Sequence, residues 1–280
     1  MEKQNLSLRA AQMRRWILEA VYCAKSGHLG GSLSMAEILA ALYFEEMKVD
    51  PNNPRDPDRD RFVLSKGHCS PALYAALALR GFFPPEELRE FRTLSSRLSG
   101  HVEMNHVPGV DMSAGSLGQG FSAAVGMAIA AKLDKKDYRV FCVMGDGEVQ
   151  EGQIWEAAMS AAHYKLDNLV GIVDNNNLQI SGSVDKVLSP YPLDEKFAAF
   201  GFAVIPCNGN SIESVRAALA KAREVKGQPA LILAKTLKGR GVSFMEDNYA
   251  WHGAPPNKEQ YEQAAGELDA AIEKTQKEVG

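Results

Sequence analysis

Residues 139–147 read Arg-Val-Phe-Cys-Val-Met-Gly-Asp-Gly, and residues 169–177 read Leu-Val-Gly-Ile-Val-Asp-Asn-Asn-Asn. Each stretch opens with a continuous apolar run, which is typical of a strand buried on both faces of a parallel sheet, and each closes on polar residues. The segment between them, from about Gly152 to Lys165, is predicted to be a helix. A strand, a helix and a second strand are the repeating unit of α/β folds, so these two stretches decide the fold.

The same alternation continues on both sides of this unit. The sequence predicts further strands at residues 61–64, 202–206 and 230–234 and helices at residues 6–25, 118–132, 194–200, 212–225 and 258–277. The links between these segments are mostly short. We therefore predict an α/β fold: a single three-layer α/β/α domain over residues 1–280 with a mainly parallel sheet.

One long loop region interrupts the pattern. Residues 95–117 contain Gly, Ser, His and Pro with little periodicity, and long irregular segments in compact domains are often functional. Near the N-terminus, Ser34 precedes an apolar segment and is expected to cap the helix that follows it.

Composition restricts the kinds of partner. The hydrophobic fraction is 45%, the charged fraction is 24% and the formal net charge is −4. No basic stripe is visible, so we expect no nucleic acid partner. No apolar run reaches the roughly 20 residues of a membrane span, and no signal peptide is visible, so we expect no membrane partner. The four cysteines are far apart, which suits reduced thiols and a cytoplasmic protein. They are Cys23, Cys69, Cys142 and Cys207.

Polar residues follow several predicted strands directly. Ligands of an open parallel sheet bind beyond the carboxyl ends of the strands, where these residues would meet. Asp146 and Asn176 end neighbouring strands and offer the hard oxygen atoms that Mg²⁺ prefers. The backbone carbonyl of Leu178 is a possible third ligand, and the glycines beside Asp146 would let a phosphate approach the backbone closely. The residues therefore predict a site for Mg²⁺ and a diphosphate.

The whole unit, apolar strand, Gly-Asp-Gly turn, helix, apolar strand and Asn-Asn, resembles the thiamine diphosphate motif of thiamine-dependent enzymes. The flanking motifs resemble those of the transketolase family and occur in the same order from about Leu8 to Pro256. They are Ser26-Gly27-His28, Phe62-Val63-Leu64-Ser65-Lys66-Gly67-His68, Gly100-His101-Val102-Glu103, Gly115-Ser116-Leu117-Gly118-Gln119-Gly120, Ala234-Lys235-Thr236 and Trp251-His252-Gly253-Ala254-Pro255. Leu29 and Ser116 stand where the family often has proline, which puts only local loop geometry in doubt.

The resemblance implies a role for each matching residue. Asp146, Asn176 and the Leu178 carbonyl would bind Mg²⁺. The cofactor thiamine diphosphate would be contacted by His68, Gly115, Ser116, Leu117, Gly147, Asn176 and His252. The catalytic residues would be His28, His101 and His252, since imidazole can both accept and return a proton. His106 and His163 match no motif and are expected to be structural. Lys235 and Lys238 could meet phosphate, although solvated lysines are an equal alternative.

The resemblance covers only part of a full-length transketolase. The family carries a pyrimidine-binding domain and a C-terminal domain after the diphosphate-binding domain, and an activating glutamate comes from the second of these three domains. This chain runs from Met1 to Gly280, and we interpret it as a complete N-terminal subunit of a split transketolase. It would be inactive alone and would need a companion subunit, with two copies of each in a heterotetramer.

The implied reaction is transfer of a two-carbon glycolaldehyde unit from a ketose phosphate to an aldose phosphate, as in the pentose phosphate pathway. Four alternatives stay open. The chain could belong to a 2-oxo acid dehydrogenase α-type enzyme or to a deoxyxylulose phosphate synthase, although the former lacks the Gly-His motifs and the latter lacks the Gly100-to-Glu103 segment in this form. It could also be a transketolase-like enzyme for an unusual sugar, or a non-catalytic cofactor-binding protein. The sequence does not disclose the substrate.

Overall fold

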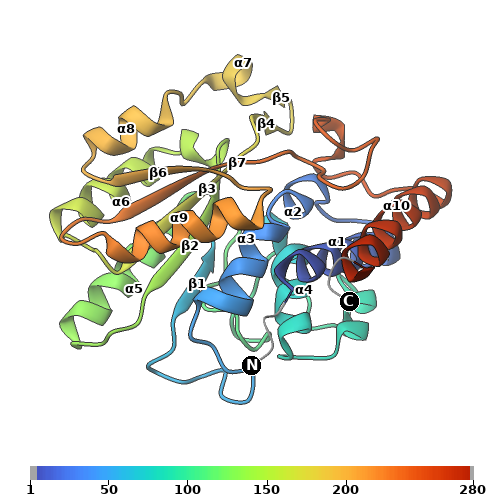
Figure 1. Ribbon diagram of the computed structural model, residues 1–280, viewed down its shortest axis with the longest axis horizontal. Helices are drawn as coiled ribbons and strands as arrows, with labels where there is room; N and C mark the ends of the chain where they lie inside the picture. The colour runs from blue at the N-terminus through green and yellow to red at the C-terminus, as the bar shows by residue number, and fades with distance from the viewer. Residues whose placement is uncertain (1–4, 278–280) are drawn as a thin grey trace.

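A five-stranded sheet forms the centre of the computed structural model, which describes residues 5–277 (Figure 1). Met1 and Gly280, the ends of the expected 1–280 domain, lie outside the described residues. All neighbouring strands in this sheet are parallel, in the order β1-β2-β3-β7-β6. Their bounds are β1 Arg61–Leu64, β2 Val140–Gly145, β3 Leu169–Asn175, β6 Ala203–Asn208 and β7 Ala230–Lys235.

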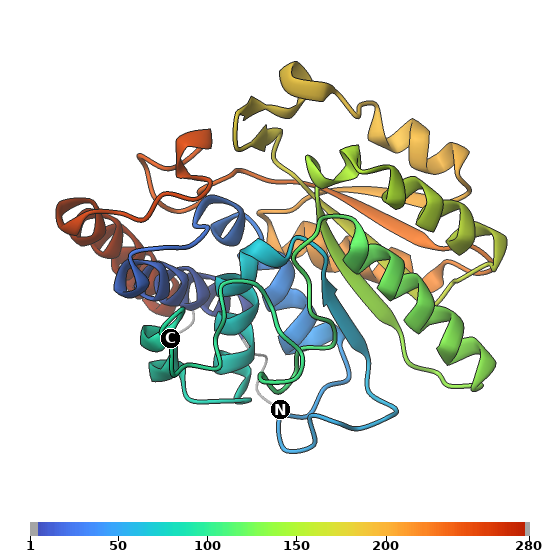
Figure 2. The same cartoon turned by 180° about the vertical axis from the view of Figure 1, so that it is seen from behind.

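Helices cover both faces of the sheet (Figures 1 and 2). One face carries α5 (Gln119–Leu133), α6 (Gly152–His163) and α8 (Leu193–Ala199). The other carries α3 (Ala36–Ala41), α4 (Ser70–Arg80) and α9 (Ile212–Glu224), with α1 (Leu6–Ala24) and α10 (Lys258–Lys277) packed together beyond them. The predicted three-layer α/β/α arrangement with a mainly parallel sheet is confirmed.

Successive side chains of β2 enter different hydrophobic cores, which explains why its sequence shows no alternation of apolar and polar residues. Phe141 and Val143 join the core under α3 and α9, whereas Val140 and Cys142 join the core under α5 and α6. All four side chains are completely buried. A strand buried on both faces must be apolar at every position, which is why β2 reads as one continuous apolar run.

Shorter elements connect this framework. A two-stranded antiparallel hairpin follows β3 and lies over the carboxyl end of the sheet, next to a short helix (Figure 1). The bounds of these elements are β4 Leu178–Gln179, β5 Gly182–Ser183, α7 Val184–Leu188, α2 Gly30–Leu33, the π-helix Leu42–Glu46, and the 3₁₀ turns Gly67–Cys69, Pro85–Glu90, Glu148–Gln150 and Tyr249–Trp251. Residues 95–117 contain no helix or strand, as predicted. No helix within residues 5–277 is long and apolar enough to cross a membrane.

The expected helix cap at Ser34 is wrong. The residue that precedes α3 is Met35, which makes no side-chain cap. The Ser34 hydroxyl instead donates to Asp174, 140 positions away, with an Oγ–Oδ2 distance of 2.6 Å. A hydrogen bond to an ionised carboxylate is stronger than one between neutral groups, so Asp174 rather than the helix end orients the Ser34 side chain.

Gly67 marks a close approach of two loops at the end of β1. A Cβ atom at this position would clash with the carbonyl group of Ala114. The turn after β1 is therefore held directly against the irregular segment 95–117, because only glycine leaves room for the contact.

Candidate active site

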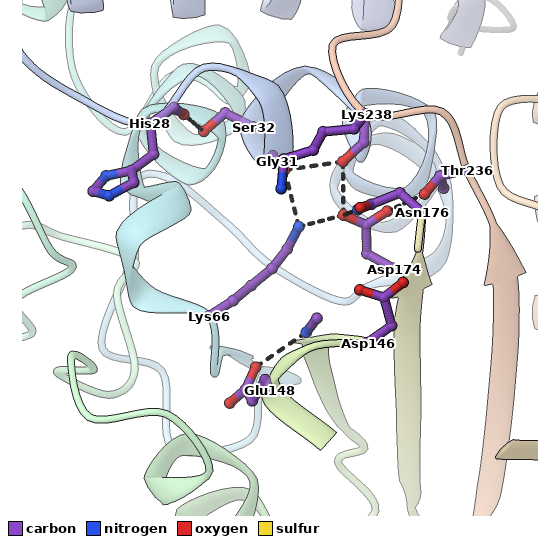
Figure 3. Close-up of polar contacts among 12 residues, drawn as sticks. His28, Gly31, Ser32, Lys66, Asp146, Glu148, Asp174, Asn176, Thr236 and Lys238 are labelled. Carbon is purple, nitrogen blue, oxygen red and sulfur yellow. Dashed lines mark hydrogen bonds and ion pairs between the residues drawn. The ribbon is translucent and has the colours of Figure 1, made fainter. Parts of the chain in front are cut away.

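The largest convergence of polar groups lies at the carboxyl ends of β1, β2, β3 and β7, around a cavity of about 340 Å³. Loops from distant parts of the sequence bring side chains to it, and Figure 3 shows several of them pointing inward. Its lining includes His28, Lys66, His68, His101, Gly115, Leu117, Asp146, Gly147, Glu148, Asp174, Asn176, Leu178, Lys238 and His252. This is the position at which open parallel sheets bind ligands.

A second cavity of about 430 Å³ lies beside α6 and α8, but its lining is mostly apolar. Trp155, Leu188 and Phe200 form much of its wall, and Lys196 donates to the backbone carbonyls of Pro190 and Tyr191 rather than into the cavity. Of these two cavities, only the one at the ends of the strands collects several titratable side chains. We therefore take that cavity as the candidate active site.

Asp146 lies at the end of β2 and is 2% exposed. Its carboxylate accepts the backbone N–H groups of Gly147, at 2.8 Å, and Asn177. It forms no salt bridge with any residue from 5 to 277. Burial raises its pKa from 3.8 to about 6, and the two backbone donors and the nearby Lys238 cation, which makes no ion pair with it, only partly oppose that shift. A buried carboxylate without a counter-charge is the arrangement that a bound cation would complete.

Asn176 and Leu178 line the same cavity as Asp146. The Asn176 amide is oriented at both ends: its Oδ1 accepts the Leu178 N–H at 3.1 Å and its Nδ2 donates to Asp174 at 3.3 Å. The predicted metal ligands are thus brought together as one carboxylate, one amide and one carbonyl group. Residues 5–277 include no cluster of three His, Cys, Asp or Glu side chains that could hold a metal ion alone. These oxygen donors suit Mg²⁺, which usually takes some of its ligands from phosphates and water.

Asp174 ends β3 and is fully buried, but the protein supplies its counter-charge. Lys66 Nζ donates to it at 2.5 Å, and the hydroxyls of Ser34 and Thr236 donate as well (Figure 3). Burial opposes ionisation, yet these donors outweigh it and hold the pKa of Asp174 below its usual value. Burial also lowers the pKa of Lys66, but Asp174 raises it by more. The pair is therefore ionic and braces the strand ends.

Four histidines surround the mouth of the cavity. The ring of His28 lies 5.0 Å from that of His68, 5.4 Å from that of His252 and 6.1 Å from that of His101, measured between ring centroids. They come from the loop after α1, the turn after β1, the irregular segment 95–117 and the loop after β7. The sequence motifs predicted this meeting, and the fold produces it.

The electrostatics of the cavity keep these histidines neutral. Burial is the main cause in each case, and neighbouring cations add to it. It lowers the pKa of His28 and His68 to about 4 and the pKa of His252 to about 2, and it also lowers the pKa of His101. A neutral imidazole has one N–H donor and one free lone pair, so each ring can accept a proton or donate a hydrogen bond at neutral pH.

The other predicted residues divide into two groups. Gly115, Leu117 and Gly147 line the cavity. Ser116 is exposed and does not line it. Outside the cavity lie His106, which pairs with Glu103 at 2.9 Å, and His163, which ends α6. The expected solvated lysine is found for Lys235, whereas Lys238 is buried in the cavity wall.

Sequence reasoning missed Lys66, Asp174 and Glu148. The Glu148 carboxylate accepts the Ser65 hydroxyl and the backbone N–H groups of Gly118 and Gly145, so it ties three loops together. Burial raises its pKa. One signal could have found all three residues: a charged side chain within a few positions of the end of an apolar strand.

The comparisons with known proteins agree with this geometry. The family model described as transketolase, thiamine diphosphate binding domain, matches residues 7–275. The chain is 45% identical to one of the subunits of the apulose-4-phosphate transketolase of Phocaeicola vulgatus, over 99% of both proteins. It is also 45% identical to a 6-deoxy-6-sulfo-D-fructose transketolase subunit of a Clostridium species, over 96% of this chain and 98% of that protein.

Longer relatives are matched over less than half of their length. Mouse transketolase is 44% identical over 98% of this chain, which spans 44% of the mouse protein. The crystal structure of Campylobacter jejuni transketolase superposes with a TM-score of 0.89 at 35% identity, covering 98% of this chain and 46% of that one. The chain thus spans less than half of these long relatives and nearly all of the short subunits.

Proposed function

This chain belongs to the transketolase family, and from that premise we propose that it is one subunit of a two-subunit transketolase. In the proposed reaction, a two-carbon glycolaldehyde unit passes from a ketose phosphate to an aldose phosphate. The observation that carries the proposal is the meeting of an unpaired buried carboxylate, Asp146, with four neutral histidines around one cavity. A site that only bound the cofactor would not need the histidines.

The metal site is the first part of the proposal. Asp146, Asn176 and the Leu178 carbonyl would hold Mg²⁺, and the diphosphate of the cofactor would complete its coordination. Gly147 and His68 would lie beside the phosphates, where a glycine backbone permits close approach. The absence of a salt bridge to Asp146 within residues 5–277 supports this assignment, because the cation would add the direct counter-charge that nearby Lys238 only partly provides.

The histidines are the second part. When bound, thiamine diphosphate supplies an electron sink for the carbanion that forms as the ketose carbon–carbon bond breaks. His28, His101 and His252 would face the sugar. Their neutral rings would accept the proton of a ketose hydroxyl through a ring nitrogen and return it to the new sugar.

The third part is the companion subunit. Two relatives that this chain covers almost completely are named as subunits, which supports a partner carrying the pyrimidine-binding and C-terminal domains. We propose two copies of each subunit. The four cysteines are all free thiols, which supports a cytoplasmic enzyme.

The test is reconstitution. The chain and its companion subunit would be purified separately and assayed together with Mg²⁺, thiamine diphosphate and a panel of ketose donors. The relatives' names place apulose 4-phosphate and a sulfofructose on that panel beside pentose phosphates. We expect ketol transfer by the mixture and none by either protein on its own. Transfer by this chain alone would refute the two-subunit proposal, and binding without transfer by the mixture would refute the catalytic one.

A second test concerns His252. In the assembled enzyme, His252→Ala should keep its affinity for thiamine diphosphate within a few-fold but lower kcat about a hundredfold, the usual loss when an acid–base group is removed. An unchanged kcat would assign His252 a structural role.

A further inference from the structure

Lys238 is a buried cation that joins two parts of the cavity wall. It is 3% exposed, and it forms no salt bridge with any residue from 5 to 277. Its Nζ donates to the Leu178 carbonyl at 2.8 Å and lies 3.0 Å from Nδ1 of His252. The lysine thus connects the start of β4 to His252, farther along the loop after β7.

The backbone fixes the position of this lysine. Gly239 N–H donates to the Gly30 carbonyl at 3.0 Å, and Asp247 N–H donates to the Lys238 carbonyl at 3.0 Å. The aliphatic stem of Lys238 lies over Gly30, where an added Cβ would come within 2.9 Å of Cγ. Figure 3 shows the side chain lying beside Gly31 in the upper wall of the cavity. The ammonium group therefore has little freedom to leave His252.

The chemistry of the two groups determines which histidine nitrogen carries the hydrogen. A lysine ammonium has three hydrogens and no lone pair, so it can only donate. Nδ1 of His252 must then accept, and a neutral ring that accepts at Nδ1 carries its hydrogen on Nε2. We propose that Lys238 is a positioning residue that holds His252 as the Nε2–H tautomer, with that N–H available to the cavity.

This inference rests on the proposed function for its catalytic meaning, because the Nε2–H group would be the one presented to sugar or cofactor oxygen atoms. The arrangement is compatible with a bound metal ion. A carbonyl oxygen has two lone pairs, so Leu178 can accept the Lys238 hydrogen bond and ligate Mg²⁺ at the same time. Lys238 would then align a metal ligand and a catalytic histidine through one group.

The test reads the tautomer directly. Histidine side-chain ¹⁵N–¹H correlation spectra of the full-length ¹⁵N-labelled chain distinguish the two neutral tautomers, and His252→Gln identifies the signal of His252. We expect the Nε2–H pattern in the unmodified chain and in Lys238→Arg, which keeps a cationic donor. Lys238→Met keeps the stem over Gly30 but removes the donor, so His252 should become a mixture of tautomers. Lys235→Met is the matched control, because Lys235 is exposed three positions earlier, and it should leave the signal unchanged.

Turnover in the assembled enzyme is the second readout. We expect kcat to fall about tenfold in Lys238→Met, the usual weight of one hydrogen bond to a charged group, with KM for the ketose unchanged. Lys238→Arg should recover most of that loss. An Nδ1–H or doubly protonated His252 in the unmodified chain would overturn the inference even if Lys238→Met failed to fold. So would an unaltered tautomer in a folded Lys238→Met. Neither result depends on ketol transfer, whose absence would instead refute the proposed function.

Discussion

Asp146 and Asp174 end neighbouring strands, and the register places Gly145 opposite Asp174. Their exposures are 2% and 0%, so both carboxyl groups are equally removed from water. The surroundings differ. Asp174 receives Lys66 and two hydroxyl groups from the chain itself, whereas Asp146 receives only backbone N–H groups and the hydroxyl of Tyr191 at 3.3 Å. Burial alone therefore does not distinguish the two carboxylates; the direct ion pair of Asp174 with Lys66 does.

The largest effect that we expect is a loss of stability when Asp174 is substituted. Asp174→Asn keeps the shape of the side chain but leaves the Lys66 ammonium buried without a counter-charge. The free energy of unfolding should fall by about 3 to 5 kcal/mol, the cost of breaking a buried ion pair. Urea unfolding measures this loss. Adding Lys66→Met should restore part of the stability, and a loss below about 1 kcal/mol would show that the pair does not brace the sheet.

The second effect is on ligand binding at Asp146. Asp146→Ala should abolish Mg²⁺-dependent binding of thiamine diphosphate while the fold remains intact. Groups that only orient metal ligands contribute about 10- to 100-fold to affinity, so loss of a ligand itself should exceed about a hundredfold. Isothermal titration calorimetry with and without Mg²⁺ measures the change.

Asp167→Ala is the control for that titration, since Asp167 pairs with Lys132 far from the cavity and should keep normal affinity. If Asp146→Ala bound the cofactor as tightly as the unmodified chain, the metal assignment would be wrong.

The third effect is a gain in stability at Asp146, opposite to the loss expected at Asp174. Asp146 has a pKa near 6 in the folded chain against an ordinary value of 3.8. Well below pH 3.8 it is protonated in both states, but above pH 6 the folded chain must hold a buried charge that costs stability. Asp146→Asn never ionises, which removes a charge cost of about 3 kcal/mol at pH 7.5, but its NH₂ group cannot accept one of the two backbone N–H groups, a loss of about 1 kcal/mol. The metal-free variant should therefore be more stable than the unmodified chain by about 2 kcal/mol.

That gain should shrink as the pH falls from 6 towards 4, and thermal unfolding across this range tests it. Asp174 should behave in the opposite way, because its pKa is lowered: its stabilising charge is present above pH 3.8 and is lost as the pH falls through the folded pKa. A variant Asp146→Asn that is less stable at pH 7.5 would mean that the chain does supply a counter-charge.

The smallest effects on stability should come from removing one hydroxyl donor from each of the two carboxylates. Thr236→Val removes a donor from the fully buried Asp174 and should lower the free energy of unfolding by about 1.5 kcal/mol. Tyr191→Phe removes the long contact to Asp146 and a 2.7 Å bond to Asn175, both in a half-buried position, and should cost less than about 1 kcal/mol. Chemical denaturation of both variants ranks them, and equal losses would erase the distinction between the two aspartates.

The fold was largely predictable because its signals are local. The apolar runs at residues 139–144 and 169–173, the turn after each and the helix between them lie within one βαβ unit, and periodicity is sufficient to identify them. The family motifs also placed the four histidines and the metal ligands at one edge of the sheet. What they could not give was the partner of each charged group.

The missed features are long-range pairings. Lys66 and Asp174 are 108 positions apart, and Ser34 and Asp174 are 140 apart, so neither contact leaves a periodic trace in the sequence. The Ser34 prediction failed for this reason, since local rules favoured a helix cap. Lys238 illustrates the same limit. The segment Lys238-Gly239-Arg240-Gly241 has the composition of a solvated loop, and only the folded chain shows the backbone bonds that hold Lys238 in a buried position.

The contact at Gly67 has a consequence for how sequence variants of this protein should be interpreted. No atom of Gly67 takes part in the proposed chemistry, yet any side chain there would push the turn that carries His68 away from the segment that follows His101. In a saturation mutagenesis screen scored by activity, Gly67 should therefore tolerate as few substitutions as Asp146. A screen scored by soluble yield would separate the two positions. Substitution of Asp146 removes a metal ligand but keeps the fold, whereas a side chain at Gly67 disturbs the packing of two loops.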